Sequence, residues 1–404
     1  MSAETPAIWV VTTHGREALT GAPSDRILDV LVRNGVPWSA VSMYLRAAPG
    51  ESLALTAGLD RRLDSFPAGS ELFLYFNRNI NPFLFDIRNP TLVADEAEGA
   101  ESTEYIYQRM DNDGARVETL LKKLTPEECR GIIADRVAET IRAHVPAGET
   151  LVVGVSGGGD SNAMLHGLTQ LGEDGPTIRP MIIKGIPDWD LGVPRAQALC
   201  DRYGLALDVV EEGDVMRLLG MEPGRDSLVE RFEREFPGDD FEFLGTLLIR
   251  LALSKRAAEL GATYVATGIN LEDILCESLY RVSQGLAPAR HPLRPIGPVN
   301  LVMPLWMCPK KIIDGCFPTY SRENYDARYP CFSLGRNTYY AMAYALQSQF
   351  PGMAERMVQG YAQVAEQVPT TYEYNEDLGF HVERFVPFPL LVKFRRLLKP
   401  ADGA

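Results

Sequence analysis

Short apolar runs separated by polar turns divide the amino-terminal part of the chain. Residues 8–13 and 71–76 are rich in β-branched and aromatic side chains and predict strands, with a short second strand after the first. Residues 25–34 have the apolar spacing of an amphipathic helix. The resulting order is strand, strand, helix, strand.

This order predicts an α+β domain over residues 1–93. It resembles a small β-grasp, ubiquitin-like module, and an irregular α+β cap fits the pattern equally well. Residues 95–113 are acidic and poorly periodic, which indicates a linker or a solvated helix. Thr125-Pro-Glu-Glu then predicts a capping box and a helix that ends near His144. Residues 94–146 are therefore expected to form an acidic linker and a helix.

A strand, a glycine-rich loop and a helix follow one another after residue 150. Residues 151–155 form a short run rich in valine, 156–161 are Ser-Gly-Gly-Gly-Asp-Ser, and 162–171 have helical apolar spacing. Consecutive glycines let backbone N–H groups point inward, and the helix N-terminus adds its positive dipole, so the loop can hold phosphate oxygens. Ser156 and Ser161 add hydroxyl groups, and Asp160 can hold a divalent cation. A tight turn with a capped helix is the alternative interpretation.

The loop resembles the PP-loop of the N-type ATP pyrophosphatases. The resemblance implies an α/β, Rossmann-like doubly wound parallel sheet over residues 147–300, with ATP and Mg²⁺ as ligands. It also implies that the loop grips the pyrophosphate portion of ATP while a substrate oxygen attacks the α-phosphate, which yields an adenylated intermediate. The loop lacks the Gly-Lys-Ser/Thr of a Walker A motif, so transfer of the γ-phosphate is not indicated. The nucleotide-binding residues implied here are Ser156, Gly157, Gly158, Gly159, Asp160 and Ser161.

A second motif follows a predicted helix at 242–260 and a predicted strand at 263–267. Residues 268–278, Gly-Ile-Asn-Leu-Glu-Asp-Ile-Leu-Cys-Glu-Ser, resemble the acidic stretch of the tRNA-thiolating members of the superfamily. The resemblance implies that Thr267, Gly268 and Asn270 contact the nucleotide and that Asp273 is the second magnesium ligand beside Asp160. A capped, charged first helical turn is the alternative for Asp273 and Glu277.

A third predicted strand, at 179–185, ends at the same carboxyl edge of the sheet. The resemblance implies that the backbone of Ile183 contacts the adenine base. Lys184 is a candidate for stabilising the charge that builds on the α-phosphate during attack, and a surface lysine is the alternative.

The tail resembles the 2-thiocytidine tRNA synthetases at residues 302–313 and 350–357, within a region 301–404 that is expected to be mostly helical. Two departures separate the chain from that group. Glu242-Phe-Leu-Gly245 stands where those relatives have a Cys-x-x-Cys pair, which leaves only Cys331 at a matching position, so no iron–sulfur cluster of that type is expected. Ile269 and Asn270 stand where the relatives have histidine, and an amide cannot shuttle protons.

Composition limits the partners and the compartment. The chain has 404 residues, 46% of them hydrophobic, and a net charge of −14, which opposes non-specific attraction to nucleic acid or anionic lipid. Residues 281–404 contain fourteen Lys and Arg and ten Asp and Glu and carry +4, against −18 for residues 1–280. Residues 1–13 do not have a signal pattern, and six cysteines without a Cys-x-x-Cys pair suit a reducing compartment, so a cytoplasmic protein without a membrane partner is expected.

Three functions remain open. The first is a tRNA-modifying enzyme that adenylates a base and then installs sulfur or an amine, and the second is a ligase that adenylates a small-molecule or protein carboxylate. The third is a non-catalytic nucleotide-binding subunit, which the presence of both Asp160 and Asp273 argues against. Cys276 and Cys331 are candidate sulfur carriers, or buried apolar residues. The acceptor and the oligomeric state, for which a homodimer is one option, do not follow from the sequence.

Overall fold

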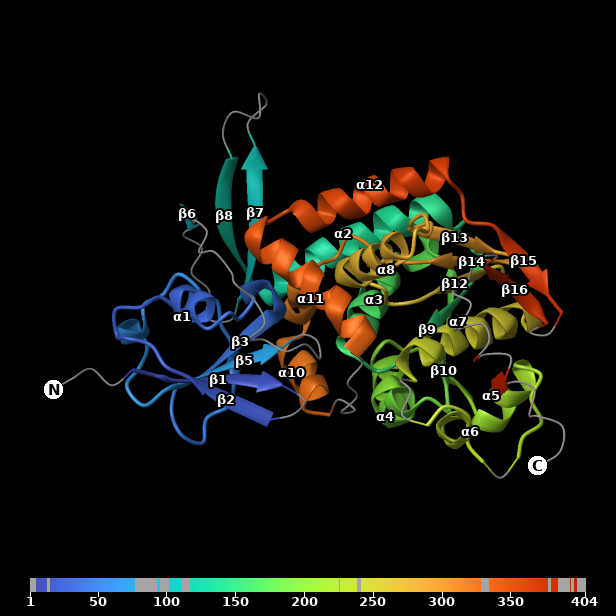
Figure 1. Ribbon diagram of the computed structural model, residues 1–404, viewed down its shortest axis with the longest axis horizontal. Helices are drawn as coiled ribbons and strands as arrows, with labels where there is room; N and C mark the ends of the chain where they lie inside the picture. Colours follow the sequence, from blue (N-terminus) through green and yellow to red (C-terminus); the bar gives the residue numbers. More distant parts are fainter. Residues whose placement is uncertain are drawn as a thin grey trace. The chain divides into compact units, whose positions relative to one another are not determined.

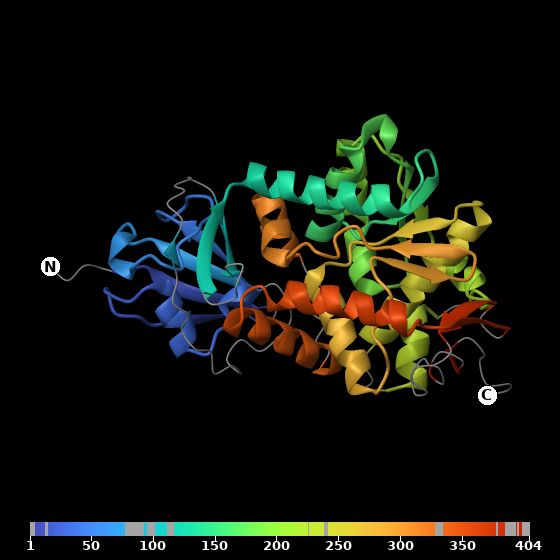
Figure 2. The same ribbon diagram turned by 90° about the horizontal axis from the view of Figure 1, so that it is seen from above.

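The computed structural model describes residues 5–12, 15–76, 93–94, 102–110, 117–224, 226–237, 241–327, 334–376, 379–383, 393 and 396–397. Its chain divides into two compact units (Figures 1 and 2). The first contains residues 1–133, 270–277 and 307–360, and the second contains residues 134–269, 278–306 and 361–404.

A five-stranded sheet with the order β2-β1-β5-β3-β4 forms the amino-terminal part of the first unit. The pair β1 and β5 is parallel and the other pairs are antiparallel. The strands and the helix expected before residue 76 are present. This arrangement is compatible with the expected β-grasp, which stays a prediction. The elements are β1 (Ala7–Thr12), β2 (Gly15–Leu19), α1 (Ile27–Arg33), η1 (Trp38–Ala40), β3 (Val41–Arg46), β4 (Ala54–Leu55), η2 (Leu63–Ser65) and β5 (Glu71–Phe76).

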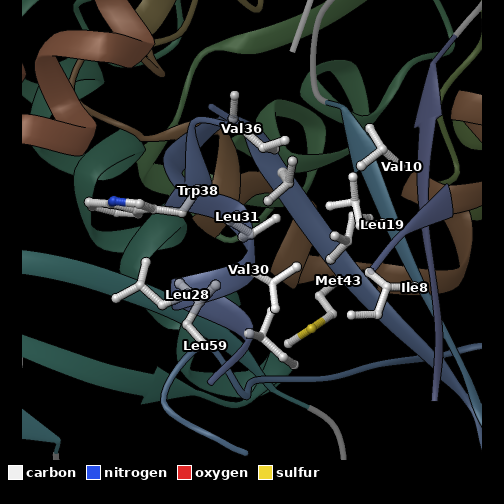
Figure 3. Close-up of a cluster of buried hydrophobic side chains, with 14 of the residues drawn as sticks. Ile8, Val10, Leu19, Leu28, Val30, Leu31, Val36, Trp38, Met43 and Leu59 are labelled. Atoms are coloured by element: carbon white, nitrogen blue, oxygen red, sulfur yellow. The ribbon is translucent and has the colours of Figure 1, made fainter. Parts of the chain in front are cut away.

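Apolar side chains lie on both faces of this sheet because successive residues of a strand point to opposite sides. Ile8 and Val10 of β1 join the buried residues of α1 in one cluster, whose labelled members converge in Figure 3. Trp9 and Val11 of the same strand pack on a second cluster that contains Tyr325 from the carboxyl-terminal part of the unit. The sheet is therefore buried between two apolar layers.

Residues 102–124 correct the sequence interpretation. The strands β7 (Thr103–Met110) and β8 (Val117–Leu124) form an antiparallel hairpin, and β6 (Val93–Ala94) pairs with β8 in parallel. A linker or solvated helix is thus wrong for 103–110, where Thr103, Tyr105, Ile106 and Tyr107 are β-branched or aromatic residues that favour a strand. Residues 95–101, which carry much of the acidic run, lie outside the described residues.

Three of the remaining helices, α2, α8 and α12, contain residues assigned to both units. Helix α2 starts at the expected capping box, in which the Thr125 N–H donates to Glu128 Oε2 at 2.8 Å and the Glu128 N–H donates to Thr125 Oγ1 at 3.3 Å. It ends at His144, as expected. The helices are α2 (Pro126–His144), α8 (Leu271–Ser283), α9 (Lys310–Cys316), α10 (Pro318–Asp326), α11 (Leu334–Gln349) and α12 (Met353–Gln367).

The second unit contains the expected parallel sheet, in the order β11-β10-β9-β12-β14-β13. All pairs are parallel except the edge pair of β13 and β14. Counted in chain order from β9, the strands lie in the order third, second, first, fourth, sixth, fifth. The first four follow the doubly wound order, which reverses between β9 and β12. The α/β, Rossmann-like prediction is confirmed. The strands are β9 (Thr150–Gly154), β10 (Thr177–Ile183), β11 (Asp208–Val210), β12 (Tyr264–Ala266), β13 (Leu293–Ile296) and β14 (Val299–Val302).

Helices cover this sheet because its central strands are apolar on both faces. In Figure 1, α7 runs along the sheet, where it contacts β9, β10, β12 and β14. None of the helices in the described ranges has the length and apolar composition needed to cross a bilayer. The helices are α3 (Gly159–Thr169), η4 (Gly172–Asp174), α4 (Pro187–Arg202), α5 (Glu212–Leu218), α6 (Leu228–Glu235) and α7 (Glu242–Glu259), and a hairpin of β15 (Tyr372–Asn375) and β16 (Phe380–Glu383) follows α12.

Candidate functional site

The loop after β9 has the conformation that its glycines allow. Gly157 has φ +75°, in the region that side chains disfavour, and Gly158 is the N-cap of α3 in an extended conformation. The Ser156 N–H donates to Ser161 Oγ at 3.0 Å, and the two hydroxyl oxygens lie 3.2 Å apart. This bond closes the loop on the first turn of α3. The N-terminal N–H groups of that helix then suit an anion.

The loop after β12 lies directly against this turn. A Cβ atom on Gly268 would lie 3.2 Å from Asp160 Cβ and 3.4 Å from the Asp160 carbonyl carbon. Glycine at 268 therefore permits the close approach of the two loops. Because β9 and β12 flank the reversal of strand order, Asp160 and Gly268 mark the point where open α/β sheets bind ligands.

Two buried polar atoms on residues next to these two loops have no hydrogen-bond partner among the residues that the structure describes. They are Thr267 Oγ1 and Asn162 Nδ2, on the residues that precede Gly268 and follow Ser161. The Tyr203 hydroxyl donates to Asn162 Oδ1 at 2.9 Å, which fixes the amide with its NH₂ group unused. Buried polar groups are nearly always paired, so these two atoms suit a polar ligand. Asn162 was missed from the sequence because only its buried position distinguishes it from other helical polar residues.

Ile183 is the last residue of β10, and Lys184 follows it at the same edge of the sheet. The Lys184 Nζ atom forms an ion pair with Glu211 Oε2 at 2.7 Å, and a hydrogen bond with that carboxylate raises the pKa of the lysine. The ammonium group therefore stays charged but is held by a neighbour on the surface. The Gly185 N–H donates to Asp190 Oδ1 at 2.9 Å, and burial raises the pKa of Asp190. The nucleotide roles of Ile183 and Lys184 stay predictions.

Asn270 and Asp273 lie in the first unit and cap α8 reciprocally. The Asn270 N–H donates to Asp273 Oδ2 at 3.1 Å, and the Asp273 N–H donates to Asn270 Oδ1 at 3.0 Å. The Tyr340 hydroxyl of α11 donates to Asp273 Oδ1. The helix begins at Leu271. The capped first turn, the alternative considered for Asp273, is thus present, and its role as a metal ligand stays a prediction.

Of the two cysteines that are candidate sulfur carriers, the structure describes only Cys276. Cys276 is buried in the same apolar cluster as Tyr340 and Tyr344, and so serves as a core residue in this structure. The alternative interpretation, a buried apolar residue, thus describes Cys276, because a thiol that carries sulfur must be accessible to its partner. Cys331 lies outside the described residues.

Gly192 is a residue of the site that sequence reasoning missed. A Cβ atom at this position of α4 would overlap the Ser156 carbonyl group, so α4 packs directly on the backbone of the glycine-rich loop. A lone glycine within a helical pattern often has a packing reason, and this signal could have identified it.

Comparisons with known proteins give matches only among solved structures, since no family model and no curated protein matches the chain. The U34-tRNA thiolase NcsA from Methanococcus maripaludis, with its 4Fe-4S cluster, is 20% identical, with a TM-score of 0.47 over 61% of this chain and 82% of that one. The NH₃-dependent NAD synthetase from Campylobacter jejuni is 14% identical, with a TM-score of 0.35 over 63% and 100%. The NMN synthetase from Francisella tularensis is 13% identical, with a TM-score of 0.34 over 63% and 99%.

The TM-scores are all low, so no function is carried over from these structures.

Proposed function

We propose that this protein is an adenylating enzyme that converts ATP to AMP and pyrophosphate while it activates a substrate oxygen. The observation that supports the proposal most directly is the closed glycine-rich loop after β9. Two buried polar atoms, Asn162 Nδ2 directly after this loop in the chain and Thr267 Oγ1 directly before Gly268, have no hydrogen-bond partner in the described part of the chain. Backbone N–H groups at a helix N-terminus suit the pyrophosphate portion of ATP. The unpaired hydroxyl and amide supply further polar contacts.

The reaction is a displacement at the α-phosphorus. A substrate oxygen forms the new bond to this phosphorus, and the bond to the bridging oxygen of pyrophosphate breaks. The negative charge that develops on the leaving pyrophosphate is stabilised by the N–H groups of the loop and of the first turn of α3. A sulfur or nitrogen nucleophile then displaces AMP from the activated substrate.

Asp160 is the residue proposed to hold Mg²⁺ in the second unit. The described residues contain no group of three His, Cys, Asp or Glu side chains arranged for a metal ion. Magnesium commonly binds through one or two carboxylates together with phosphate oxygens, so a single aspartate beside the loop fits an ion carried by ATP. The ion would neutralise phosphate charge. Asp273 is proposed as the second carboxylate.

Adenylation is tested by the formation of AMP and by exchange of labelled pyrophosphate into ATP. Asp160→Ala should lose at least a hundredfold of either activity. Asp174→Ala is the matched control, because Asp174 is an exposed carboxylate in η4, and it should keep full activity. Equal turnover by the wild type and Asp160→Ala would contradict the assignment.

A tRNA base is the proposed acceptor, and a carboxylate is the alternative. The moderate match of 302–313 and 350–357 to tRNA thiolating enzymes supports RNA, whereas the acidic charge and the missing cluster cysteines support a carboxylate. Mass spectrometry of tRNA nucleosides from a deletion strain tests the tRNA acceptor, and an unchanged nucleoside profile would exclude that acceptor. The carboxylate acceptor is tested by pyrophosphate exchange with candidate carboxylic acids in the absence of RNA, and an acid that stimulates the exchange would support it.

A further inference from the structure

The packing of α4 on the glycine-rich loop brings an arginine to the proposed nucleotide site. A Cβ atom on Gly157 would lie 2.7 Å from the Gly192 carbonyl oxygen, 2.8 Å from the Ala196 nitrogen and 2.9 Å from Arg195 Cβ. The Arg195 side chain therefore starts directly beside the loop.

Arg195 has no counter-ion within the described residues. Its Nε atom is buried and makes no hydrogen bond, and the arginine forms neither an ion pair nor a ring contact there. Three other arginines have a buried Nε without a hydrogen bond, and each pairs with a carboxylate through its other nitrogens: Arg46 with Glu71, Arg256 with Glu259, and Arg322 with Glu323. Arg195 differs from them in lacking that anion.

An unpaired guanidinium is costly when part of it is removed from water, because it stays charged at any physiological pH. Asp190, on the same helix, already accepts the Gly185 N–H at 2.9 Å. The neighbouring feature that suits an anion is the glycine-rich loop at the N-terminus of α3. A guanidinium can bind two oxygens of one phosphate, which a single N–H group cannot do.

We propose that Arg195 binds the pyrophosphate portion of the nucleotide held by residues 156–161. This inference rests on the proposed function, since it takes the loop as the phosphate site. Arg195 then neutralises charge on the β- and γ-phosphates and stabilises pyrophosphate as it leaves. The residue is not part of the motif, and only the packing of α4 brings it to the loop.

The test compares the affinities of the full chain for MgATP, for inorganic pyrophosphate with Mg²⁺, and for AMP by titration calorimetry. Arg195→Gln removes the positive charge. Arg195→Lys keeps the charge but cannot bind two oxygens of one phosphate as the planar guanidinium can. Arg202→Gln is the matched control, since Arg202 is an exposed arginine near the end of the same helix. Thermal melting checks that each variant is folded.

We expect Arg195→Gln to weaken MgATP and pyrophosphate binding about tenfold or more, as expected for a lost charged hydrogen bond, with a smaller loss for Arg195→Lys. AMP, which lacks the pyrophosphate, should bind all variants with affinity within twofold of the wild type. Wild-type pyrophosphate affinity in Arg195→Gln, or an equal loss for AMP and pyrophosphate, would overturn the inference.

A second measurement needs no variant. Phenylglyoxal modifies accessible guanidinium groups, and mass spectrometry locates the products in the wild-type protein. Pyrophosphate should protect Arg195 and leave Arg202 unprotected, and the absence of such protection would count against the inference. If the wild type bound neither MgATP nor pyrophosphate, the proposed function itself would fail. If it bound both while the Arg195 variants matched it, only the role of Arg195 would fail.

Discussion

A Cβ atom on Gly192 would overlap the carbonyl oxygen of Ser156. Glycine at this position of α4 thus lets a helix backbone rest on the backbone of the loop after β9, where any other residue would have to push the loop aside. The loop and α4 consequently form one packed element, and the geometry of the proposed phosphate site depends on a residue outside its motif.

Gly192→Ala should disturb this element. We expect the free energy of unfolding to fall by about 1–3 kcal/mol, the usual cost of overpacking, and MgATP affinity to fall with it. Gly131→Ala is the matched control, because Gly131 is a helical glycine of α2 with open space at its Cβ position. That variant should be neutral or more stable by up to about 1 kcal/mol. Urea unfolding measures both, and equal effects would contradict the packing role of Gly192.

Ser161→Ala should open the loop. The Ser156 N–H would lose its partner, which costs about 1–3 kcal/mol when the group stays buried. We therefore expect a lower melting temperature and slower AMP formation. Ser283→Ala removes a hydroxyl that lies on an exposed residue and donates to the Tyr280 carbonyl at 2.7 Å, and it should change neither quantity. A fully active and stable Ser161→Ala variant would show that the closing bond is dispensable.

Buried thiols should make stability fall at high pH. Burial raises the pKa of Cys200 from 9.0 to about 11 and that of Cys129 to about 12. Between pH 9 and these values the unfolded chain loses thiol protons that the folded chain keeps, so the free energy of unfolding decreases as pH rises. Urea unfolding at pH 8 and pH 10.5 measures the decrease. It should be smaller in Cys200→Ala, and an identical decrease in that variant would refute the explanation.

The ion pair of Arg281 and Glu383 should stabilise the second unit. Their side chains are only 9% and 13% exposed, and both guanidinium nitrogens lie 2.6 Å from carboxylate oxygens. Removing one partner leaves a buried charge and should cost about 3–5 kcal/mol. The variants Arg281→Met and Glu383→Gln, with their double variant, give a double-mutant cycle by urea unfolding. Additive losses would mean that the two groups do not interact.

Tyr340→Phe should test how Asp273 is held. The phenol bonds one carboxylate oxygen while the other oxygen caps α8. Loss of one such bond should lower the free energy of unfolding by about 1 kcal/mol. If Asp273 is the second magnesium carboxylate, the variant should also need a different Mg²⁺ concentration for half-maximal AMP formation, with kcat at saturating Mg²⁺ nearly unchanged. An unaltered Mg²⁺ dependence would leave the tyrosine with a structural role only.

Local patterns predicted much of the fold. The apolar runs at 151–155 and 263–267 became β9 and β12, and the Thr125 capping box started α2 where expected. These signals depend on side chains within a few residues of one another, and neighbours along the chain decide them. The hairpin at 103–124 was missed because its strands pair with each other and with β6, while the acidic residues before them dominated the composition.

The sequence by itself determined the strand, glycine loop and helix at 150–169, because the loop conformation requires glycine and the closing bond joins Ser156 to Ser161 only five positions away. Tertiary structure alone decided which side chains from distant parts of the sequence contact one another. Arg195 reaches the loop through the packing of α4, Lys184 is held by Glu211, and Asp273 is bonded by Tyr340. Each of these contacts joins residues whose spacing carries no local pattern, so only the folded chain could bring them together.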